Sequence, residues 1–233
     1  MKIPLSPRLA ACCQFVASGD RVADIGTDHG YLGIWLLHNG VARSVIAVDI
    51  AQGPLSAAKQ NAVKFDCSQK MEFYLSDGVS AIPRDFDTMV CAGMGADTMI
   101  SILSAAPWLR QPQYRLILQC QSKTPQLRRY LSENSWQIQQ EILVRDGKFL
   151  YSVMEVLFRE GHALTPEQWY LSPALLESSA PELPEYYHRL VGGLRLAVAG
   201  HGENADPELV SALHRLETDP NLQWLKENLH DNG

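Results

Sequence analysis

Several features are missing from this 233-residue chain, and each absence narrows what it can be. No run of 18 consecutive apolar residues occurs, so a membrane-spanning helix and a membrane partner are not expected. Leu9-Ala10-Ala11-Cys12 resembles a lipoprotein cleavage site, but Pro7 and Arg8 precede it where a signal peptide needs an apolar segment. Internal repeats and low-complexity segments are also absent. We therefore expect a globular protein without a signal peptide.

Cysteines are few and show no metal-binding pattern. Of the five, Cys12 and Cys13 are adjacent, whereas Cys67, Cys91 and Cys120 are isolated. An odd number of unpatterned thiols is typical of a reducing compartment. We expect a cytoplasmic protein without structural disulfides and without a metal site.

An excess of positive charge is missing as well, since the formal net charge is -6. Residues 1–160 hold 16 Lys and Arg against 15 Asp and Glu, whereas residues 161–233 hold 4 against 11. The nearly neutral first part can carry a local basic patch, but the acidic tail should repel a polyanion. Bulk charge therefore does not indicate a nucleic-acid substrate.

Predicted strands and helices alternate through most of the chain. Asp146-Gly147 between two strand-like runs is a strong signal for a hairpin turn. Five βα units followed by a hairpin predict an α/β fold, with a doubly wound and mostly parallel sheet that ends in an antiparallel strand. The expected strands are 21–25, 44–48, 71–75, 87–92, 114–119, 136–145 and 149–158, and the expected helices are 5–16, 31–39, 53–65, 97–105 and 124–134.

The end of the chain has a different composition. Residues 159–182 contain several prolines and are expected to form a loop, and helices are expected over 183–199 and 206–229. We therefore divide the chain into an α/β domain, residues 1–160, and a small helical C-terminal domain, residues 161–233.

One stretch, residues 22–32, has the pattern of a nucleotide-binding turn. A short buried strand ends at Ile25, Gly26 and Gly30 permit a tight turn, and Asp28 is a candidate cap for the helix that follows. A strand, a glycine turn and a helix N-terminus form a binding site at the carboxyl edge of a parallel sheet.

The residue types in this turn favour S-adenosylmethionine over a dinucleotide. A dinucleotide fingerprint requires glycine where this chain has Asp28 and Tyr31. Asp28 would direct a carboxylate at a pyrophosphate, which costs several kcal/mol, roughly, in a partly desolvated turn. The sulfonium of S-adenosylmethionine tolerates a nearby carboxylate, and the terminal hairpin also departs from an ordinary dinucleotide fold.

Two further acids follow predicted strands. Asp49 ends the second strand, where a carboxylate can accept protons from ribose hydroxyls. Asp77 follows the third strand, next to Gly78, and its carboxylate can accept a proton from an adenine amino group. The residues expected to bind the cofactor are Asp24, Gly26, Thr27, Gly30, Asp49, Ile50, Asp77, Gly78 and Ala92.

The fourth strand ends where a methyltransferase meets its acceptor. Here the chain reads Ala92-Gly93-Met94-Gly95, without the Asn-Pro-Pro-Tyr or Asp-Pro-Pro-Tyr signature of many base amino-group methyltransferases. Backbone groups of this small turn can hold the edge of a flat base.

Together these motifs resemble the tRNA (adenine(22)-N(1))-methyltransferase family. The resemblance covers residues 5–158 and rests mainly on the stretch 24–32, the 92–95 turn and the hairpin around Asp146. It implies a class I, Rossmann-like methyltransferase fold with a helical C-terminal extension, S-adenosylmethionine as cofactor and N1 of a tRNA adenine as acceptor. Cys120-Gln121 stands where the family is expected to have Pro-Asn, and the tail is acidic rather than a basic coiled coil.

The resemblance also implies a reaction centre. Asp28 is expected near the transferring methyl group or the target amino group, His29 to orient the base or relay a proton, and Tyr31 to stack on the base. The backbone of Gly93, Met94 and Gly95 would read the base edge. The residues expected to contact tRNA phosphates are Arg8, Lys59, Lys123, Arg128, Arg129, Arg145 and Lys148.

Two other functions fit the same sequence. One is a methyltransferase for another RNA or a small molecule, which the acidic tail permits. The other is a non-catalytic S-adenosylmethionine-binding module that acts through its helical tail. The complete set of Asp24, Gly26, Asp49 and Asp77 argues against the second. The sequence leaves the oligomeric state open.

Overall fold

The computed structural model of the chain describes residues 2–159 and 163–227, and its centre is a seven-stranded sheet. The strand order is β3-β2-β1-β4-β5-β7-β6, and β7 alone runs antiparallel to its neighbours. The predicted mostly parallel α/β sheet with a terminal hairpin is therefore confirmed. The strands are β1 (Asp20–Ile25), β2 (Ala42–Asp49), β3 (Met71–Leu75), β4 (Thr88–Met94), β5 (Arg115–Cys120), β6 (Trp136–Asp146) and β7 (Phe149–Phe158).

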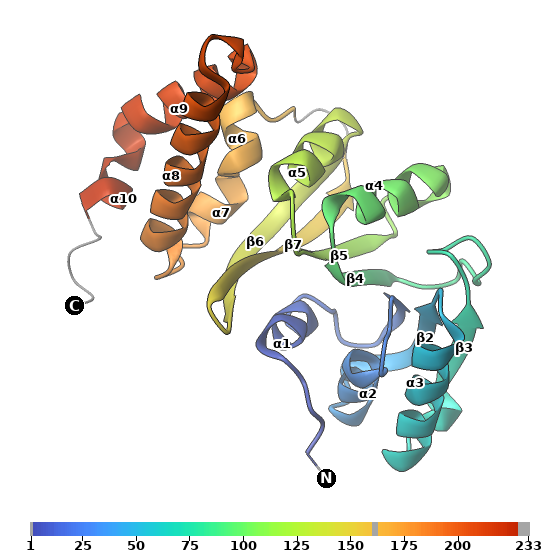
Figure 1. Cartoon of the computed structure of the whole chain (residues 1–233). Coiled ribbons are helices and arrows are strands. Elements are labelled where there is room, and N and C mark those ends of the chain that lie inside the picture. Colours follow the sequence, from blue (N-terminus) through green and yellow to red (C-terminus); the bar gives the residue numbers. More distant parts are fainter. Residues whose placement is uncertain (1, 160–162, 228–233) are drawn as a thin grey trace.

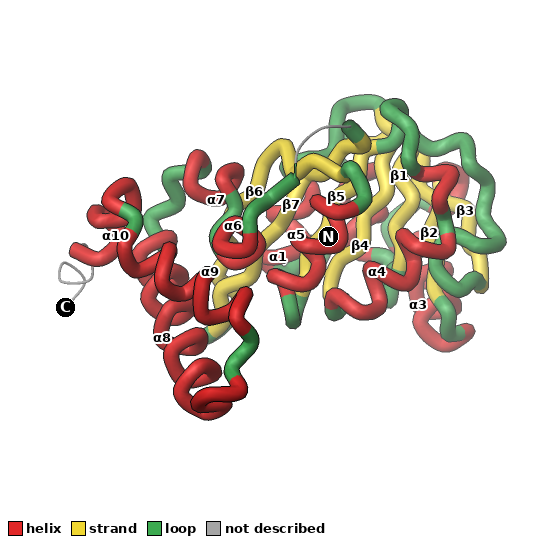
Figure 2. The backbone as a smooth tube through the Cα atoms, turned by 90° about the horizontal axis from the view of Figure 1, so that it is seen from above, coloured by secondary structure: helices red, strands yellow, loops and turns green. Residues whose placement is uncertain are grey.

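Helices cover both faces of this sheet (Figures 1 and 2). Successive strand residues point to opposite faces, so Val22 and Val45 pack beneath one set of helices while Ala23 and Ile46 pack beneath the other. Both faces are buried, as a parallel sheet requires. One face carries α1 (Pro7–Cys13), α2 (Tyr31–His38) and α3 (Gln52–Lys64), and the other carries α4 (Ala96–Ala105) and α5 (Thr124–Glu133).

The order of these elements differs from the prediction at one point. No helix follows β3 in the described structure, because the turns of residues 76–87 lead directly into β4. The expectation of five complete βα units is therefore wrong for the third unit. The other strands and helices of the α/β part lie within a few residues of their predicted bounds.

The tail is helical, but it contains more and differently placed helices than expected. The supposed loop 159–182 contains α6 (Pro166–Tyr170) and α7 (Pro173–Glu177), which begin at the capping residues Thr165 and Ser172. Helix α8 (Leu183–His201) follows as predicted. The helix expected over 206–229 is broken, because Pro220 ends α9 (Pro207–Thr218) and α10 (Gln223–Glu227) starts afresh. Residues 228 and 229, and the proposed boundary at residue 160, lie outside the described residues.

The tail helices pack against one another and against the edge strand of the sheet (Figure 1). Their apolar side chains form a separate cluster that includes Leu143 of β6. No helix in the described ranges is long and apolar enough to cross a membrane.

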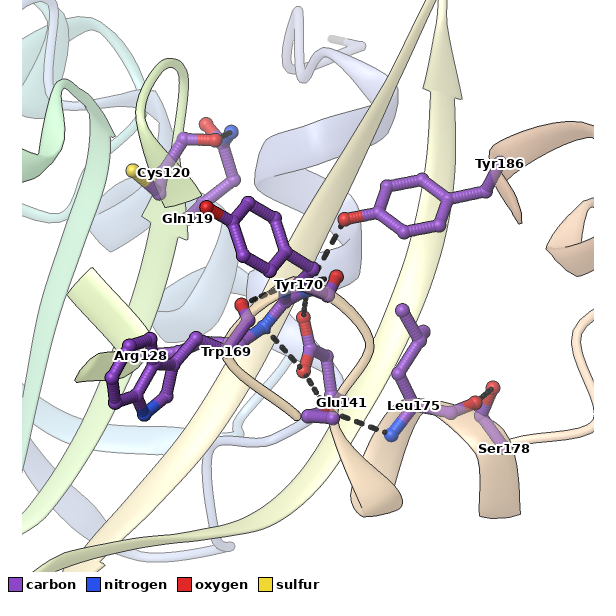
Figure 3. Close-up of polar contacts among 10 residues, drawn as sticks. Gln119, Cys120, Arg128, Glu141, Trp169, Tyr170, Leu175, Ser178 and Tyr186 are labelled. Carbon is purple, nitrogen blue, oxygen red and sulfur yellow. Dashed lines mark hydrogen bonds and ion pairs between the residues drawn. The ribbon is translucent and has the colours of Figure 1, made fainter. Parts of the chain in front are cut away.

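A buried ion pair between α5 and β6 binds the tail through hydrogen bonds (Figure 3). Arg128 of α5 and Glu141 of β6 both have fully buried side chains, with an Nη2–Oε1 distance of 2.5 Å. Arg128 also donates to the backbone carbonyls of Trp169 and Tyr170, and the hydroxyl of Ser172 donates to Glu141. Burial disfavours the charge of Arg128, but Glu141 more than compensates and leaves the pKa of the guanidinium above its usual value.

Candidate functional site

The carboxyl ends of β1, β2, β4 and β5 meet at one edge of the sheet. Strand β1 pairs with β2 on one side and with β4 on the other. The chain therefore turns away in opposite directions at β1, which creates the crevice where open α/β sheets bind ligands. The glycine turn after β1 and the small turn at the end of β4 lie on either side of this crevice.

The glycine turn is tightly constrained. Gly26 has a φ of +73°, and a β-carbon there would lie 2.4 Å from the Cε of Met94. Gly30 has a φ of +74°, and a β-carbon there would lie 3.1 Å from the β-carbon of Ala58 on α3. Any side chain at Gly26 or Gly30 would be strained by this backbone conformation, and at Gly26 it would also displace the flexible end of the Met94 side chain. The two glycines therefore allow the turn to pass between β4 and α3.

The predicted role of Asp28 as a helix cap is wrong. Gly30 is the N-cap of α2, and no side chain caps this helix. Asp28 lies in the left-handed region with a φ of 50°, and its backbone N–H donates to Oδ2 of Asp49 at 3.1 Å. Its side chain makes no cap and is 70% exposed. Short acidic residues visit this backbone region more readily than most.

Asp24 is the most buried acid of the site. Its Oδ2 accepts a hydrogen bond of 2.7 Å from the hydroxyl of Thr27. Burial, with smaller contributions from the charges of Asp49 and Asp28, raises the pKa of Asp24 to about 6, although the hydrogen bond from Thr27 opposes the shift. Among the described residues, only the hydrogen bond from Thr27 offsets the cost of burying this negative charge. A positively charged ligand beside Asp24 would therefore be stabilised.

Asp49 organises the two turns around it. Its Oδ2 accepts the N–H of Asp28, and its Oδ1 accepts the N–H of Ala51 at 2.9 Å. The next residue, Ile50, is 71% exposed. A large apolar side chain in this position offers a surface on which a flat ligand can pack.

Part of the predicted site surrounds one cavity of about 270 Å³. It includes six predicted site residues from the end of β1, the glycine turn and the start of α2, together with Ala92 and Gly93 from β4. Leu9, Leu32 and Gln121 were not predicted as site residues, and Arg8, expected near this edge of the sheet as a phosphate contact, lines the cavity itself. The lining is Arg8, Leu9, Asp24, Gly26, Thr27, Asp28, His29, Tyr31, Leu32, Ala92, Gly93 and Gln121.

The turn at the end of β4 is held by a buried amide. The N–H of Gly93 donates to Oε1 of Gln119 at 3.0 Å, and Gly93 has a φ of +80°. Gln119 is fully buried on β5. Met94 and Gly95 do not line the cavity: Met94 packs against the glycine turn, and a β-carbon on Gly95 would lie 2.9 Å from Oγ of Ser122. Gly93 thus borders the cavity, whereas the other two support the turn.

Three predicted reaction-centre side chains lie together at the mouth of the cavity. Nε2 of His29 is 3.6 Å from Oδ1 of Asp28. The rings of His29 and Tyr31 are stacked with centroids 5.8 Å apart. The backbone carbonyl of His29 accepts a bond from Asn61 of α3, which fixes the turn while the ring remains about half exposed.

Asp77 lies apart from this cavity. It lines a smaller hollow of about 110 Å³ together with Ser80, Ile102 and Trp108. Gly78 has a φ of +54°, and a β-carbon there would lie 2.9 Å from Ile102 of α4. The predicted cofactor residues thus fall into two groups, one at the glycine turn and one beyond the end of β3.

The predicted phosphate-binding residues do not form one basic surface. Arg128 is buried against Glu141, so its assignment to a phosphate is wrong. Arg129 pairs with Glu133 and with Glu208 of the tail, and Arg145 pairs with Glu185 of the tail. The acidic tail therefore neutralises cations of the α/β part. Lys123 pairs with Asp97, Lys59 and Lys148 lie over the rings of Phe73 and Phe149, and Arg8 lines the cavity.

The thiols around the site are not nucleophiles. All five cysteines are free and buried. Burial, together with the nearby charge of Asp24, raises the pKa of Cys91 in β4 to about 12. The thiol therefore stays protonated at neutral pH.

Comparisons with known proteins agree with this geometry. Residues 5–154 match the family model of a methyltransferase domain. A protein of Mycoplasma pneumoniae, provisionally named a tRNA methyltransferase, is 34% identical over 174 residues, which cover 72% of this chain and 79% of that protein. The tRNA (adenine(22)-N(1))-methyltransferase of Bacillus subtilis is 29% identical over 154 residues, covering 66% of this chain and 65% of that protein.

A solved structure extends the similarity to the tail. The Streptococcus pneumoniae protein, provisionally assigned as a tRNA (m1A22) methyltransferase, superposes with a TM-score of 0.81 at 25% identity. The match covers 92% of this chain and 98% of that one. The same protein has been solved in complex with S-adenosyl-L-methionine, again with a TM-score of 0.81.

Proposed function

This chain belongs to the tRNA (adenine(22)-N(1))-methyltransferase family, and on that premise we propose that it transfers a methyl group from S-adenosylmethionine to N1 of an adenine in tRNA, with adenine 22 as the expected target. The observation that carries the proposal is the cavity itself. It joins a buried acid, a glycine turn and a short backbone-lined β4 turn at the crevice of the sheet. We propose a cytoplasmic location, which the five free thiols fit.

The residues of the site fit this cofactor better than a dinucleotide. Asp24 is buried with its pKa raised to about 6, so a cationic ligand stabilises its charge and a pyrophosphate does not. Asp49 is held by two backbone N–H groups in a position suited to ribose hydroxyls. Ile50 offers an exposed apolar face to the adenine ring, and Asp77 with Gly78 borders the hollow beyond β3. Gly26, Thr27 and Gly30 shape the turn, and Ala92 closes the opposite wall.

The reaction requires alignment of the adenine with the methyl group rather than a general base. When bound, S-adenosylmethionine supplies a sulfonium methyl group; N1 of adenine attacks it with its own lone pair, and the electrons of the broken carbon–sulfur bond stay on sulfur. The base becomes positively charged, and no proton has to be removed for the attack. The protein must therefore align the base and tolerate a cationic product.

Three side chains at the mouth of the cavity are suited to that task. The exposed carboxylate of Asp28 offsets the positive charge that develops on the base. Tyr31 and His29 present a stacked pair of rings against which an adenine can be oriented. On the other wall, the Gly93 turn, which Gln119 holds and Met94 and Gly95 support, presents backbone groups to the edge of the base.

We also propose that the two parts of the chain have different roles. Residues 1–160 would carry the reaction, and the C-terminal part, residues 161–233, would stabilise the hairpin edge of the sheet through its described helices, α6 to α10. The Arg128–Glu141 pair and its bonds to the tail backbone support this division.

The decisive experiment supplies the purified protein with isotope-labelled S-adenosylmethionine and unmodified bacterial tRNA. Nucleoside mass spectrometry is expected to find 1-methyladenosine and no N6-methyladenosine as the first product. A protein that binds the cofactor but forms no 1-methyladenosine would refute the proposed function. Methylation of a non-RNA acceptor in the same assay would replace it with a small-molecule activity.

A further inference from the structure

Arg8 is the one lysine or arginine that lines the main cavity among the described residues. It lies in the first turn of α1, and its side chain is 30% exposed. Sequence reasoning assigned it to a tRNA phosphate, as a surface cation. Its position beside Ala92, Gly93 and Gln121 instead places it on the wall opposite the glycine turn.

The guanidinium of Arg8 is held from one side only. Its Nε is 3.3 Å from Oδ2 of Asp146, at the tip of the β6–β7 hairpin. Its Cζ lies 6.0 Å from the centre of the Tyr151 ring on β7. Its Nη1 approaches Gly93, at 3.7 Å from the point that a β-carbon there would occupy. Asp146 and Tyr151 thus orient the side chain while its terminal nitrogens extend toward the cavity.

Those terminal nitrogens have no hydrogen-bond acceptor within the described parts of the chain. Arg128 offers the contrast, because its nitrogens bond to Glu141 and to two tail carbonyls. A guanidinium presents two parallel N–H groups that match the two oxygens of a carboxylate. Arg8 therefore has the donors, the charge and the orientation to receive an anion within the cavity.

The anion follows from the proposed function, on which this inference rests. The amino-acid end of S-adenosylmethionine carries a carboxylate beside its ammonium group. Asp24 and Asp28 line the same cavity and would repel that carboxylate. The other cationic candidate, His29, lies at the mouth of the cavity and contacts Asp28. We propose that Arg8, oriented by Asp146, binds the carboxylate of the cofactor and that Asp24 stabilises its cationic part.

Ligands that differ in the carboxylate test this assignment without relying on turnover. S-adenosylhomocysteine carries the amino-acid group, whereas 5′-methylthioadenosine has the same adenosine and thioether without it. In R8Q, the Kd for S-adenosylhomocysteine is expected to rise by about tenfold to a hundredfold, the range for a lost charge-assisted pair. The Kd for 5′-methylthioadenosine should stay within about twofold of the wild-type value. R8K retains the charge but not the parallel donors, so its Kd for S-adenosylhomocysteine should lie between those of wild type and R8Q.

A matched control lies at the opposite edge of the sheet. Arg43 also pairs with an aspartate, Asp87, at 2.7 Å, but it borders no part of the cavity. R43Q should bind both ligands as the wild type does. Equal weakening of both ligands in R8Q would mean that Arg8 only maintains the shape of the pocket, which contradicts the proposal.

Two further outcomes are distinguishable. Unchanged affinity for both ligands in R8Q, with a raised KM for tRNA, would indicate that Arg8 contacts the tRNA. That result would overturn the carboxylate assignment. Failure of the wild-type protein to bind S-adenosylhomocysteine would instead refute the proposed function itself.

Discussion

Two ion pairs on β6 differ in how completely their polar groups are satisfied. In the middle of the strand, Glu141 pairs with Arg128, and both side chains are fully buried and bonded on every side (Figure 3). Near the hairpin tip, Asp146 pairs with Arg8, and both side chains are about 30% exposed. The first pair fastens the tail to the sheet. The second leaves donors that extend toward a cavity.

The same contrast separates two buried carboxylates. Glu141 accepts bonds from Arg128 and Ser172, whereas Asp24 accepts one side-chain bond, from Thr27. The pKa of Asp24 rises to about 6 as a result of its burial. The fully bonded pair therefore stabilises the packing of the fold, whereas Asp24 and Arg8, which have fewer hydrogen-bond partners, line the cavity.

The largest effect is expected from breaking the satisfied pair. R128A leaves Glu141 buried without its partner, which should lower the free energy of unfolding by about 3–5 kcal/mol. Urea denaturation followed by circular dichroism measures the change. R43Q, which breaks an exposed pair, should cost less than about 1 kcal/mol. A loss below 1 kcal/mol in R128A would remove the distinction between the two pairs.

A double substitution sharpens that result. In R128M with E141L, both charges are replaced by apolar groups, so no unpaired charge remains buried. Much of the stability lost in R128A should return, since such replacements are often neutral. If the double variant is as unstable as R128A, the bonds from Arg128 to the tail carbonyls matter more than the ion pair.

The next effect concerns the exposed carboxylate at the mouth of the cavity. D28N removes the charge that is proposed to offset the cationic product, and it keeps a side chain that tolerates the left-handed backbone. We expect kcat to fall by about tenfold to a hundredfold, while the Kd for S-adenosylhomocysteine changes by less than about threefold. A full rate of tRNA methylation in D28N would rule out this role.

Cofactor binding should also depend on pH through Asp24. Its pKa of about 6 means that the carboxyl group is largely neutral at pH 5 and charged at pH 7. A cationic ligand binds the charged form, so affinity for S-adenosylmethionine should rise by about tenfold from pH 5 to pH 7. Titration calorimetry at several pH values measures the change, and D24N should flatten it. A wild-type affinity that is constant over this range would contradict the assignment.

The same shift has the opposite sign for the free protein. Since burial raises the pKa of Asp24 above its usual value, the folded state holds this proton more tightly than the unfolded state does. The contribution of Asp24 to stability therefore falls as pH rises from about 4 to about 6. D24N should remove this part of the pH dependence of urea denaturation.

The smallest effect is expected from R8Q on stability. The pair with Asp146 is partly exposed, so its loss should cost less than about 1 kcal/mol. R8Q should fold normally and lose affinity for the cofactor carboxylate, whereas R128A should lose stability. A loss of several kcal/mol would make Arg8 a structural residue.

Local signals explain what could be predicted from the sequence. The glycine turn, the Asp146-Gly147 hairpin and the strands of the sheet each have short-range patterns, and the structure contains them. The short helices of the tail also had signals, in the caps at Thr165 and Ser172 and in the break at Pro220, but prolines in this region suggested a loop instead.

Long-range packing explains what could not be predicted. Nothing near Arg128 in the sequence indicates that Glu141 and the tail backbone will enclose it. The ion pair of Arg8 with Asp146, far along the chain, likewise has no local signal in the sequence. Asp28 looked like a helix cap, yet Gly30 occupies that position and frees the Asp28 carboxylate.

The central claim is tested most directly by mapping the methylated position. The wild-type protein is incubated with S-adenosylmethionine and an unmodified tRNA transcript that has adenine at position 22, and with a matched transcript that has guanine there. Reverse transcription is expected to stop at position 22 of the first transcript and to pass through the second, because methylation at N1 blocks base pairing. Equal methylation of both transcripts, or of neither, would contradict the assigned target.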